Sequence, residues 1–419
     1  MKLKEFLQGI PFLAWVVIYT AFCWGLFAAI LGSVTPELRQ ELGNYQALGW
    51  LMTAWASGSI VGAVQGGRLA QRLAARKLFL NYCGLALLAL LLIVLASNVW
   101  LLMLGFFCIA ILEAALITLG HSVLARVYAE PQARGRVLSL VDVAFSAGNL
   151  ATPLVVIGLQ NFSDSWRLPY QLFFIPLMAA LVLFWSHKPV PPPASQPANP
   201  EPASAGRAAA VAVAQPMSYL QLLRKPVLAW SMAAGMLGGF MEWAQYFWYV
   251  SYGIEVQHLS PNAARISLQF FIAGMVASRC WQAFWHSSWT LQQKLWRLNL
   301  LALAGLALAV VFPDHGWMPA YAIGNFLFGL GNGVVFPALL AVMINHVPSQ
   351  AARLSALLMM GFTLGAQMAG AVLGFAADWL GMHAAYGALL LAAMGFVAVT
   401  WYLRQATGRS PIQFSGSAS

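Results

Sequence analysis

Long apolar stretches separated by short polar loops dominate this sequence from one end to the other. A helix needs about 20 predominantly apolar residues to cross the roughly 30 Å hydrocarbon core of a bilayer. Twelve stretches have that character, and the pattern predicts spanning helices at residues 12–32, 47–67, 78–98, 101–125, 137–159, 168–186, 227–252, 263–285, 295–312, 317–345, 354–379 and 384–403. We therefore expect an all-α membrane protein with twelve transmembrane helices.

The connection between the sixth and seventh stretches has a different composition. Residues 188–217 are rich in Pro, Ala and Ser, and such a segment cannot bury a core, so the pattern predicts a disordered linker. The linker divides the chain into two six-span bundles, residues 1–187 and 218–405, followed by a tail at 406–419. Two pseudo-symmetric six-helix bundles are typical of transporters that rock around a central site.

The basic residues predict how the chain is oriented. With the N-terminus in the cytoplasm, 19 of the 22 Lys and Arg residues fall on the inner side of the membrane, and only Arg39, Arg167 and Arg265 fall outside. Such a bias towards the cytoplasmic side orients membrane proteins. We expect both termini and the linker to be cytoplasmic, in a multi-pass protein of a bacterial inner membrane.

Composition changes the picture only by exclusion. Hydrophobic residues make up 61% of the chain and charged residues 8%, whereas a soluble domain carries about 25% charge. The net charge of +10 is scattered over short loops and does not form a phosphate-binding face, so we expect no nucleic-acid partner. The N-terminal segment MKLKEFLQG has no cleavage signal, and we expect it to be retained.

Other chemistries lack their motifs in this sequence. The four cysteines lie in apolar stretches without metal or pairing spacing, and we interpret them as core residues. The sequence contains no Walker loop, so nothing suggests ATP as an energy source. It also lacks the clusters of His, Asp and Glu that an enzyme would need. We expect no cofactor, no metal and no enzymatic activity.

Three short segments resemble the major facilitator superfamily. GGRLAQRLAARK, residues 66–77, is similar to the G-x-L-a-D-r-x-G-r-K/R loop that follows span 2 in that family, although the family Asp is Gln71 and the second Gly is Ala74. ARGRVLSLVDVAFSAGNLATP at the start of span 5 and GMVASR at the end of span 8 also resemble family signatures. The resemblance covers nearly the whole chain and implies a central cavity lined by spans 1, 4, 7 and 10.

A narrower resemblance is to the fucose–proton symporter branch of that family. Glu113-Ala-Ala in span 4, the Gly-rich segment 329–342 with Pro337, and segment 357–378 are similar to its motifs. The branch also has a carboxylate in span 1, and residues 18–32 of this chain have none. The resemblance implies proton-coupled uptake of a small sugar-like solute.

Glu113 is the principal candidate for proton coupling. It lies in the unbroken apolar run 101–120, and intramembrane carboxylates usually handle a proton, an ion or a polar substrate. Loss of water disfavours the charged form of a carboxylate, so an unpaired acid there can exchange protons near neutral pH. The alternative is a structural acid that bonds to a neighbouring helix.

Span 7 carries the principal candidate for solute binding. Glu242 and Gln245 share a helical face in GGFMEWAQYFWYV, and Trp243 lies beside them. An acid, an amide and aromatic rings can together bind a polar or cationic solute, while interfacial anchoring by the aromatic residues is the alternative. The other polar residues expected to line the cavity are Asn325, Asn332, Gln269 and Asn149.

Four charged residues near the cytoplasmic side are candidate gating residues. They are Asp142, Arg136, Arg279 and Arg72. Asp142 lies near the inner end of span 5, where it could line the pathway or pair with Arg126, Arg136 or Arg279. Arg279 ends span 8 and could equally extend its side chain to the interface.

Glycines recur every four residues in two spans. Gly58, Gly62 and Gly66 lie in span 2, and Gly361 and Gly365 are followed by Ala369 in span 11. Small residues at this spacing let helices approach closely. The two stripes predict either a sliding contact between the halves or close packing within each bundle.

The sequence therefore favours a proton-coupled secondary transporter of a small polar solute. A proton antiporter that exports an amphipathic compound is the alternative within transport, and a membrane-embedded sensor or enzyme is the alternative class. We expect a monomer whose partners are a small solute, protons and membrane lipids. The substrate, the direction of transport and the choice between proton and sodium are left open.

Overall fold

The computed structural model describes residues 10–69, 74–128, 131–186, 217–284, 289–313, 317–347 and 350–408. Regular structure in these residues is helical. The helices of the first half are α2 (Phe12–Ser33), α3 (Thr35–Leu42), α4 (Tyr45–Leu69), α5 (Ala75–Leu95), α6 (Val99–Val127), α7 (Pro131–Gln160), α8 (Arg167–Leu172) and α9 (Phe174–Ser186). Those of the second half are α10 (Tyr219–Leu223), α11 (Pro226–Glu255), α12 (Pro261–Phe284), α13 (Leu291–Val311), α14 (Met318–Asn332), α15 (Val335–His346), α16 (Ala351–Leu380) and α17 (Met382–Gly408).

The helices account for every predicted span, although two of them are less apolar than the rest. Within the part of the chain that the structure describes, ten segments are long and apolar enough to cross a membrane, with α8 and α9 forming one of them and α14 and α15 another. The remaining two predicted spans are α11 and α12, whose 30 and 24 residues are long enough. Tyr, Trp and Gly lower the hydropathy of α11, and Arg265, Gln269 and Arg279 lower that of α12.

Several helices begin where the sequence supplies a capping residue. The Asn98 side chain accepts a hydrogen bond from the Leu101 N–H at 3.0 Å, which caps α6. Thr290 and Gln293 form a capping box at the start of α13. These side chains satisfy backbone N–H groups that have no partner within the helix, and so they fix where each helix starts.

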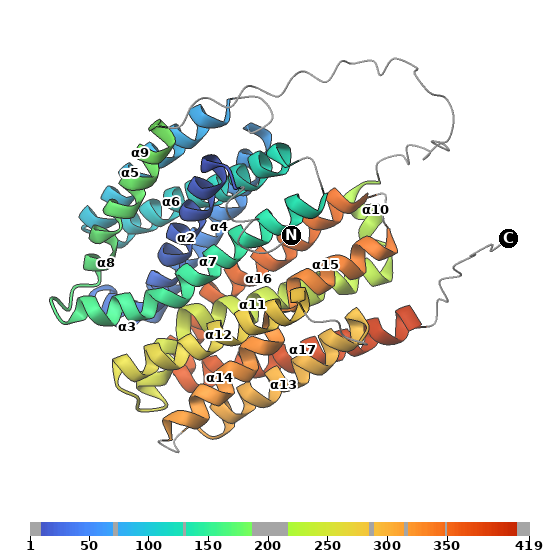
Figure 1. Cartoon of the computed structure of the whole chain (residues 1–419). Coiled ribbons are helices and arrows are strands. Elements are labelled where there is room, and N and C mark those ends of the chain that lie inside the picture. The colour runs from blue at the N-terminus through green and yellow to red at the C-terminus, as the bar shows by residue number, and fades with distance from the viewer. Residues whose placement is uncertain are drawn as a thin grey trace, which may run out of the picture.

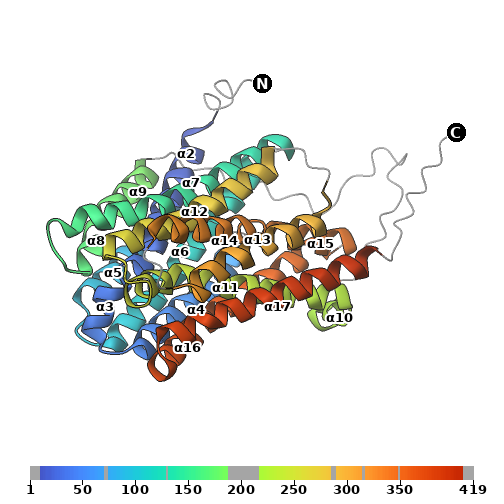
Figure 2. The same cartoon turned by 90° about the horizontal axis from the view of Figure 1, so that it is seen from below.

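Figures 1 and 2 show two groups of helices side by side, the first half in blue to green and the second in yellow to red. Within the halves the packing is repeated: α4 packs on α6 as α12 packs on α14, and α2 packs on α7 as α11 packs on α16. Between the halves, α4 meets α16, α7 meets α12 and α2 meets α11. The arrangement has the pseudo-two-fold character that the sequence predicts.

Glycines mark corresponding positions in the two halves. A Cβ added at Gly25 would lie 2.0 Å from the Phe145 carbonyl oxygen, and one added at Gly239 would lie 2.0 Å from that of Phe362. In α4, a Cβ at Gly58 would lie 2.3 Å from the Phe107 oxygen, and in α12 one at Gly274 would lie 2.2 Å from the Phe326 oxygen. Glu113 lies six residues after Phe107, and Asn332 lies six residues after Phe326. Glu113 and Asn332 therefore occupy equivalent positions in the two halves.

The glycine stripes pack within the bundles. Of the two predicted uses, the structure has close packing within each bundle and not a contact between the halves. Gly58 and Gly62 face α6, at the carbonyl oxygens of Phe107 and Ile111. Gly361 and Gly365 face α11, at the carbonyl oxygens of Met232 and Met236. Spacing alone does not say which neighbour a stripe will meet.

A different set of glycines joins the halves. A Cβ at Gly49 of α4 would lie 2.4 Å from the Gly370 carbonyl oxygen of α16, and one at Gly374 would lie 2.7 Å from the Tyr45 oxygen. The backbones of α4 and α16 therefore touch directly at this crossing.

Most of the predicted linker and tail lies outside the described residues. Met217 is described from the linker 188–217, and α17 continues through Gly408, three residues beyond the predicted end of the second bundle at 405. The domain boundaries otherwise stay predictions.

Candidate functional site

Glu113 is buried in α6 with one oxygen unsatisfied. Its relative exposure is 4%, and Oε2 has no hydrogen-bond partner among the described residues. The Trp55 side chain of α4 is a hydrogen-bond partner of the same carboxylate. Because an indole offers a single N–H, Trp55 cannot satisfy both oxygens, and the site retains a free acceptor in an apolar setting.

Aromatic side chains continue from Trp55 across the boundary between the halves. The Trp55 ring lies 4.7 Å from that of Trp243 and 5.7 Å from that of Phe247, both on α11. Tyr246 joins the group at 5.6 Å from Trp243. The predicted residue Trp243 is thus brought beside Trp55, which was not predicted, and these four rings form an aromatic bridge between the two halves.

Glu242 is as buried as Glu113 but has partners. Its relative exposure is 9%, and the Asn332 amide of α14 donates a hydrogen bond to Oε2 at 3.1 Å. The Arg279 guanidinium of α12 lies 4.0 Å from Oε1. The predicted residues Glu242, Asn332 and Arg279 are therefore brought together in the second half.

Arg279 also reaches the first half. Its guanidinium donates to the Ser146 hydroxyl of α7 at 3.3 Å and to the Gly333 carbonyl at 3.4 Å. With its contact to Glu242, this side chain links a buried acid to the opposite bundle. A change in the charge of Glu242 would be felt at the contact between α7 and α12.

Asp142 lies apart from that arginine. Its side chain is 70% exposed, although it belongs to a helix segment apolar enough to span a membrane, and its contact is with His121 at 3.4 Å. The side chains of Arg126 and Arg136 and all of Arg72 lie outside the described residues. Among the described side chains Asp142 pairs with His121, and its pairing with Arg126 or Arg136 stays a prediction.

The predicted amides divide into two groups. Gln245 donates to Asn325 at 2.7 Å and accepts from Tyr386, while Asn325 donates to Ser267, all within the second half. Gln269 instead crosses to the first half, where it donates to the Leu150 carbonyl at 3.2 Å. Asn149 is buried, and its Oδ1 has no partner among the described residues.

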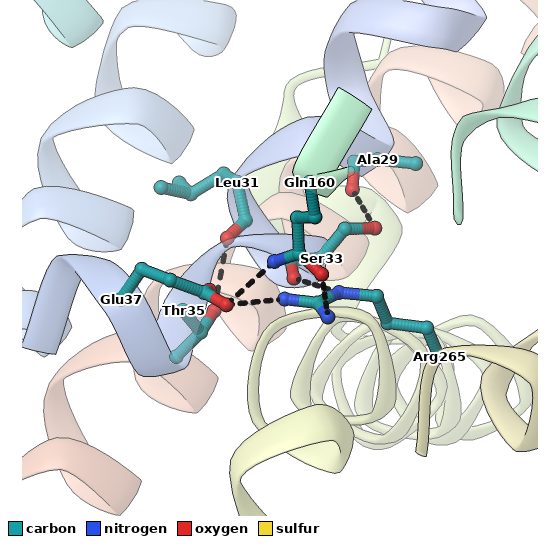
Figure 3. A network of polar contacts seen from close by, with 7 residues as sticks. All are labelled: Ala29, Leu31, Ser33, Thr35, Glu37, Gln160 and Arg265. Atoms are coloured by element: carbon teal, nitrogen blue, oxygen red, sulfur yellow. Dashed lines mark hydrogen bonds and ion pairs between the residues drawn. The ribbon is translucent and has the colours of Figure 1, made fainter. Parts of the chain in front are cut away.

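A buried ionic network joins the halves at the end of the bundle that holds α3, which we call the α3 end (Figure 3). The Arg265 side chain of α12 is fully buried and donates to Glu37 at 2.6 Å, to Gln160 at 2.7 Å and to the Ser33 carbonyl at 2.9 Å. Gln160 also donates to Glu37 at 2.7 Å. A guanidinium with partners on three elements holds α12 against α2, α3 and α7.

Two further contacts close the same end. The Arg39 and Tyr45 side chains both donate hydrogen bonds to Glu255 of α11. The Asp378 carboxylate of α16 accepts from the backbone N–H groups of Tyr45 and Gln46 at 2.9 and 2.7 Å. Asp378 thereby caps α4 from the opposite half, a favourable place for an anion. Sequence patterns did not single out these residues. The available signal was the presence of Arg39, Arg167 and Arg265 on the side that has few cations.

Glu41 at the α3 end is held by a bidentate ion pair. Arg167 donates to its two oxygens at 2.5 and 2.7 Å, and the Trp166 indole donates at 2.7 Å. The hydrogen bond from Arg167 lowers the pKa of Glu41, and the bond from Trp166 lowers it further. Partial burial raises the pKa by less, so the pKa lies below its usual value. This pair lies within the first half and does not join the bundles.

Among the described residues, no group of three or more His, Cys, Asp and Glu is placed to hold a metal ion. The arrangement is suited instead to exchanging a proton or a polar ligand between buried acids, amides and aromatic rings.

Solved structures share the fold at low sequence identity. The nucleoside transporter NupG, in a mutant form, matches with a TM-score of 0.76 and 12% identity, over 94% of this chain and 100% of that chain. A bacterial homologue of the human lysosomal transporter Spinster, inward-facing and occupied, matches with a TM-score of 0.71 and 13% identity, over 94% and 96% of the two chains.

Sequence comparisons agree with that fold. Myo-inositol transporter 1 of Candida albicans is 23% identical over 170 residues, which is 40% of this chain and 30% of the length of that relative. The family model of the Major Facilitator Superfamily matches residues 17–348, most of the chain. The protein therefore belongs to the Major Facilitator Superfamily, and it is a secondary transporter rather than an enzyme.

Proposed function

We propose that this protein couples the transport of a small, hydroxyl-rich solute to a proton by alternating access. The observation that carries the proposal is Glu113, a buried carboxylate with one oxygen free of any partner among the described residues. An isolated charge is costly away from water, so such a group alternates between a protonated form and a form stabilised by a ligand.

The aromatic bridge supports a solute site between the halves. In the first half, Trp55 contacts Glu113. In the second half, Trp243 follows Glu242 in the sequence, and its ring lies against that of Trp55. Rings on both sides can cover the apolar face of a solute while the carboxylates accept hydrogen bonds from its hydroxyl groups. Movement of one half against the other would change this site and the exposure of Glu113 together.

The closed α3 end fits one stage of such a cycle. On the orientation that the basic residues predict, the α3 end is the outer one, so the network of Arg265 and Glu37 blocks the outer route. The exposed Asp142 lies towards the opposite end. We propose that this is an inward-facing stage, and that the network must break for the solute to enter from outside.

The named relatives support the choice of solute class. One partial sequence match is a myo-inositol transporter, and one fold neighbour is a nucleoside transporter. Inositol and nucleosides both carry several hydroxyl groups, as do the sugars implied by the fucose–proton symporter resemblance. We propose this class, with uptake in an inner membrane as the direction.

Export of an amphipathic compound is the second candidate. The observation that favours it is the aromatic bridge itself, since four neighbouring rings also suit a flat apolar ligand. Purified protein tested by thermal shift against polyols, nucleosides and amphipathic cations separates the two. Stabilisation by the cations alone would favour export.

The coupling role is tested with Glu113→Gln in proteoliposomes, using a solute that passed the thermal-shift screen. The amide fixes a neutral side chain, so accumulation driven by a proton gradient should disappear. Exchange between two loaded sides should survive, because it needs no net proton release. Asp164→Asn is the matched control, since Asp164 is an exposed loop acid, and it should retain both activities.

The other outcomes reassign the residue. Loss of both activities in Glu113→Gln would make Glu113 a solute ligand or a structural residue. Unchanged accumulation would move the proton site, and Glu242→Gln is the next variant to measure. Accumulation that follows a sodium gradient and ignores the proton gradient would overturn proton coupling altogether.

A further inference from the structure

A groove opens on the outer surface of the second half, away from the contact between the halves. Its volume is about 430 Å³, and its lining comes from α13 and α17: Trp296, Leu303, Met394, Val397, Ala398 and Trp401. Met394 and Trp401 are 45% and 42% exposed. The two helices are antiparallel, so the groove runs from the tryptophans near the α17 C-terminus for two turns, or about 10 Å, into the apolar part of the bundle.

Cations and tryptophans gather at one end of the groove. The Arg404 guanidinium lies 5.4 Å from the centre of the Trp296 ring and 5.3 Å from that of Trp401. Nearby on α13, Arg297 lies 4.7 Å from the ring of Trp289, and Lys294 lies 5.2 Å from that of Trp281. Cation–π contacts hold these long side chains in defined places at the end of the apolar groove.

The helices that form this end carry basic residues and no acidic ones. Helices α12, α13 and α17 contain no Asp or Glu at all, whereas Lys294, Arg297 and Arg404 lie within a few residues of the helix ends that meet here. Tryptophan belts alone anchor helices at membrane interfaces without a groove. Here an apolar groove continues directly from the cationic end, which matches a ligand with an acidic head and a hydrocarbon tail.

We propose that this groove binds an anionic glycerophospholipid. One acyl chain lies along Leu303, Met394 and Val397, and the phosphate is bound by Arg404 and Arg297, with Lys294 beside them. On the predicted orientation this end faces the cytoplasmic leaflet, where anionic headgroups attract basic residues. The site is separate from the transport pathway, and it stands whether or not the proposed coupling mechanism holds.

Native mass spectrometry of the purified full chain tests the proposal with two lipids of matched acyl chains. Dioleoylphosphatidylglycerol should bind more tightly than dioleoylphosphatidylcholine. Arg404→Gln should lower the affinity for the first bound phosphatidylglycerol molecule by about fivefold, as expected for the loss of one surface charge. The affinity for phosphatidylcholine should not change. Ala398→Trp, which fills the groove from an exposed position, should weaken both lipids.

Lys77→Gln is the control. It removes one cation near the same end of the molecule from α5 in the other half, and it should change neither affinity. Equal binding of the two lipids, or an effect of Lys77→Gln equal to that of Arg404→Gln, would overturn the site and leave general attraction to a basic surface. Unaltered binding in Ala398→Trp would exclude the groove as the place of the acyl chain.

Discussion

Two of the crossings that join the halves, α4 with α16 and α12 with α7, correspond by pseudo-symmetry and differ in chemistry. In one, Thr53 of α4 donates to the Gln367 carbonyl of α16, and in the other, Gln269 of α12 donates to the Leu150 carbonyl of α7. Four residues before each donor, α4 has Gly49 and α12 has Arg265. Gly49 touches the backbone of α16, whereas Arg265 is buried among Glu37, Gln160 and the Ser33 carbonyl.

The difference teaches that the packing of the halves is repeated while their polar chemistry is not. At Gly49 the backbones of α4 and α16 approach closely, and the hydrogen bonds of that crossing join Thr53 to the Gln367 carbonyl and the Tyr45 and Gln46 N–H groups to Asp378. A buried guanidinium with three partners is satisfied in one arrangement only, and separating it from them leaves several groups unpaired. We infer that the buried ion pair at the crossing of α7 and α12 contributes more to the stability of the closed α3 end than the crossing of α4 and α16 does.

The same divergence occurs at the buried acids. Glu113 in the first half and Asn332 in the second occupy equivalent positions, but only Asn332 has an acid, Glu242, to bond. The equivalent of Glu242 in α2 is Ala28, because Glu242 and Ala28 each lie three residues after the matched glycines Gly239 and Gly25. The Asn332 amide donates to the Glu242 carboxylate in the second half, whereas the equivalent residues of the first half, Glu113 and Ala28, offer no such donor.

The largest effect is expected from Arg265→Gln. Removing one partner of a buried ion pair costs about 3–5 kcal/mol, and this cost falls on the state closed at the α3 end. A cysteine replacing the buried Ser33, in a background without the native cysteines, should then react much faster with a membrane-impermeant thiol reagent added at that end.

Arg39→Gln supplies the matched control at the same end. Its ion pair with Glu255 is partly exposed, at 39% and 33% for the two side chains, so the labelling rate should change little. Equal labelling in Arg265→Gln and the parent would show that the network does not hold this end closed.

A smaller effect is expected from Gly49→Ala. The new Cβ would meet the Gly370 carbonyl oxygen at 2.4 Å, so α4 and α16 must move apart, at a cost of about 1–3 kcal/mol. The melting temperature in detergent should fall, and Ser33→Cys should label faster than in the parent but more slowly than with Arg265→Gln. Gly84→Ala is the control, because nothing lies within 4 Å of the added Cβ there. A rate above that of Arg265→Gln would reverse the ranking of the two crossings.

The smallest effect concerns pH and lies within one half. The pKa of Glu41 is lowered in the folded protein, so its pair with Arg167 stabilises the fold above the ordinary carboxyl pKa of about 4.3 and is lost as the pH falls below it. Because 45% of the Glu41 side chain is exposed, the contribution should be under about 1 kcal/mol. Glu41→Gln should lower the melting temperature at pH 7 and not at pH 3. A loss of equal size at both values would assign the role of Glu41 to packing.

Particular elements show how far the sequence carries. The apolar run 101–120 and the Asn98 cap predict α6 well, because length, hydropathy and capping are local properties. The partners of Gly58 and Gly361 were open, since a stripe of small residues is compatible with any close neighbour. Trp55 carried no signal either, since a tryptophan in an apolar span reads as packing until Trp243 and Glu113 lie beside it.

The sequence by itself determined the all-helical membrane character, the apolar spans and the presence of an acid within a span, because apolar length and charge distribution act segment by segment. Only the tertiary structure decided that Glu242 meets Asn332 and Arg279 while one oxygen of Glu113 has no partner among the described residues. It also decided that Asp142 meets His121 and that Arg265 joins four elements at the α3 end. These outcomes depend on which helix lies opposite which. That choice follows from the packing of glycines and aromatic rings between segments far apart in the chain, where hydrogen bonds and charges gain their strength from shared burial.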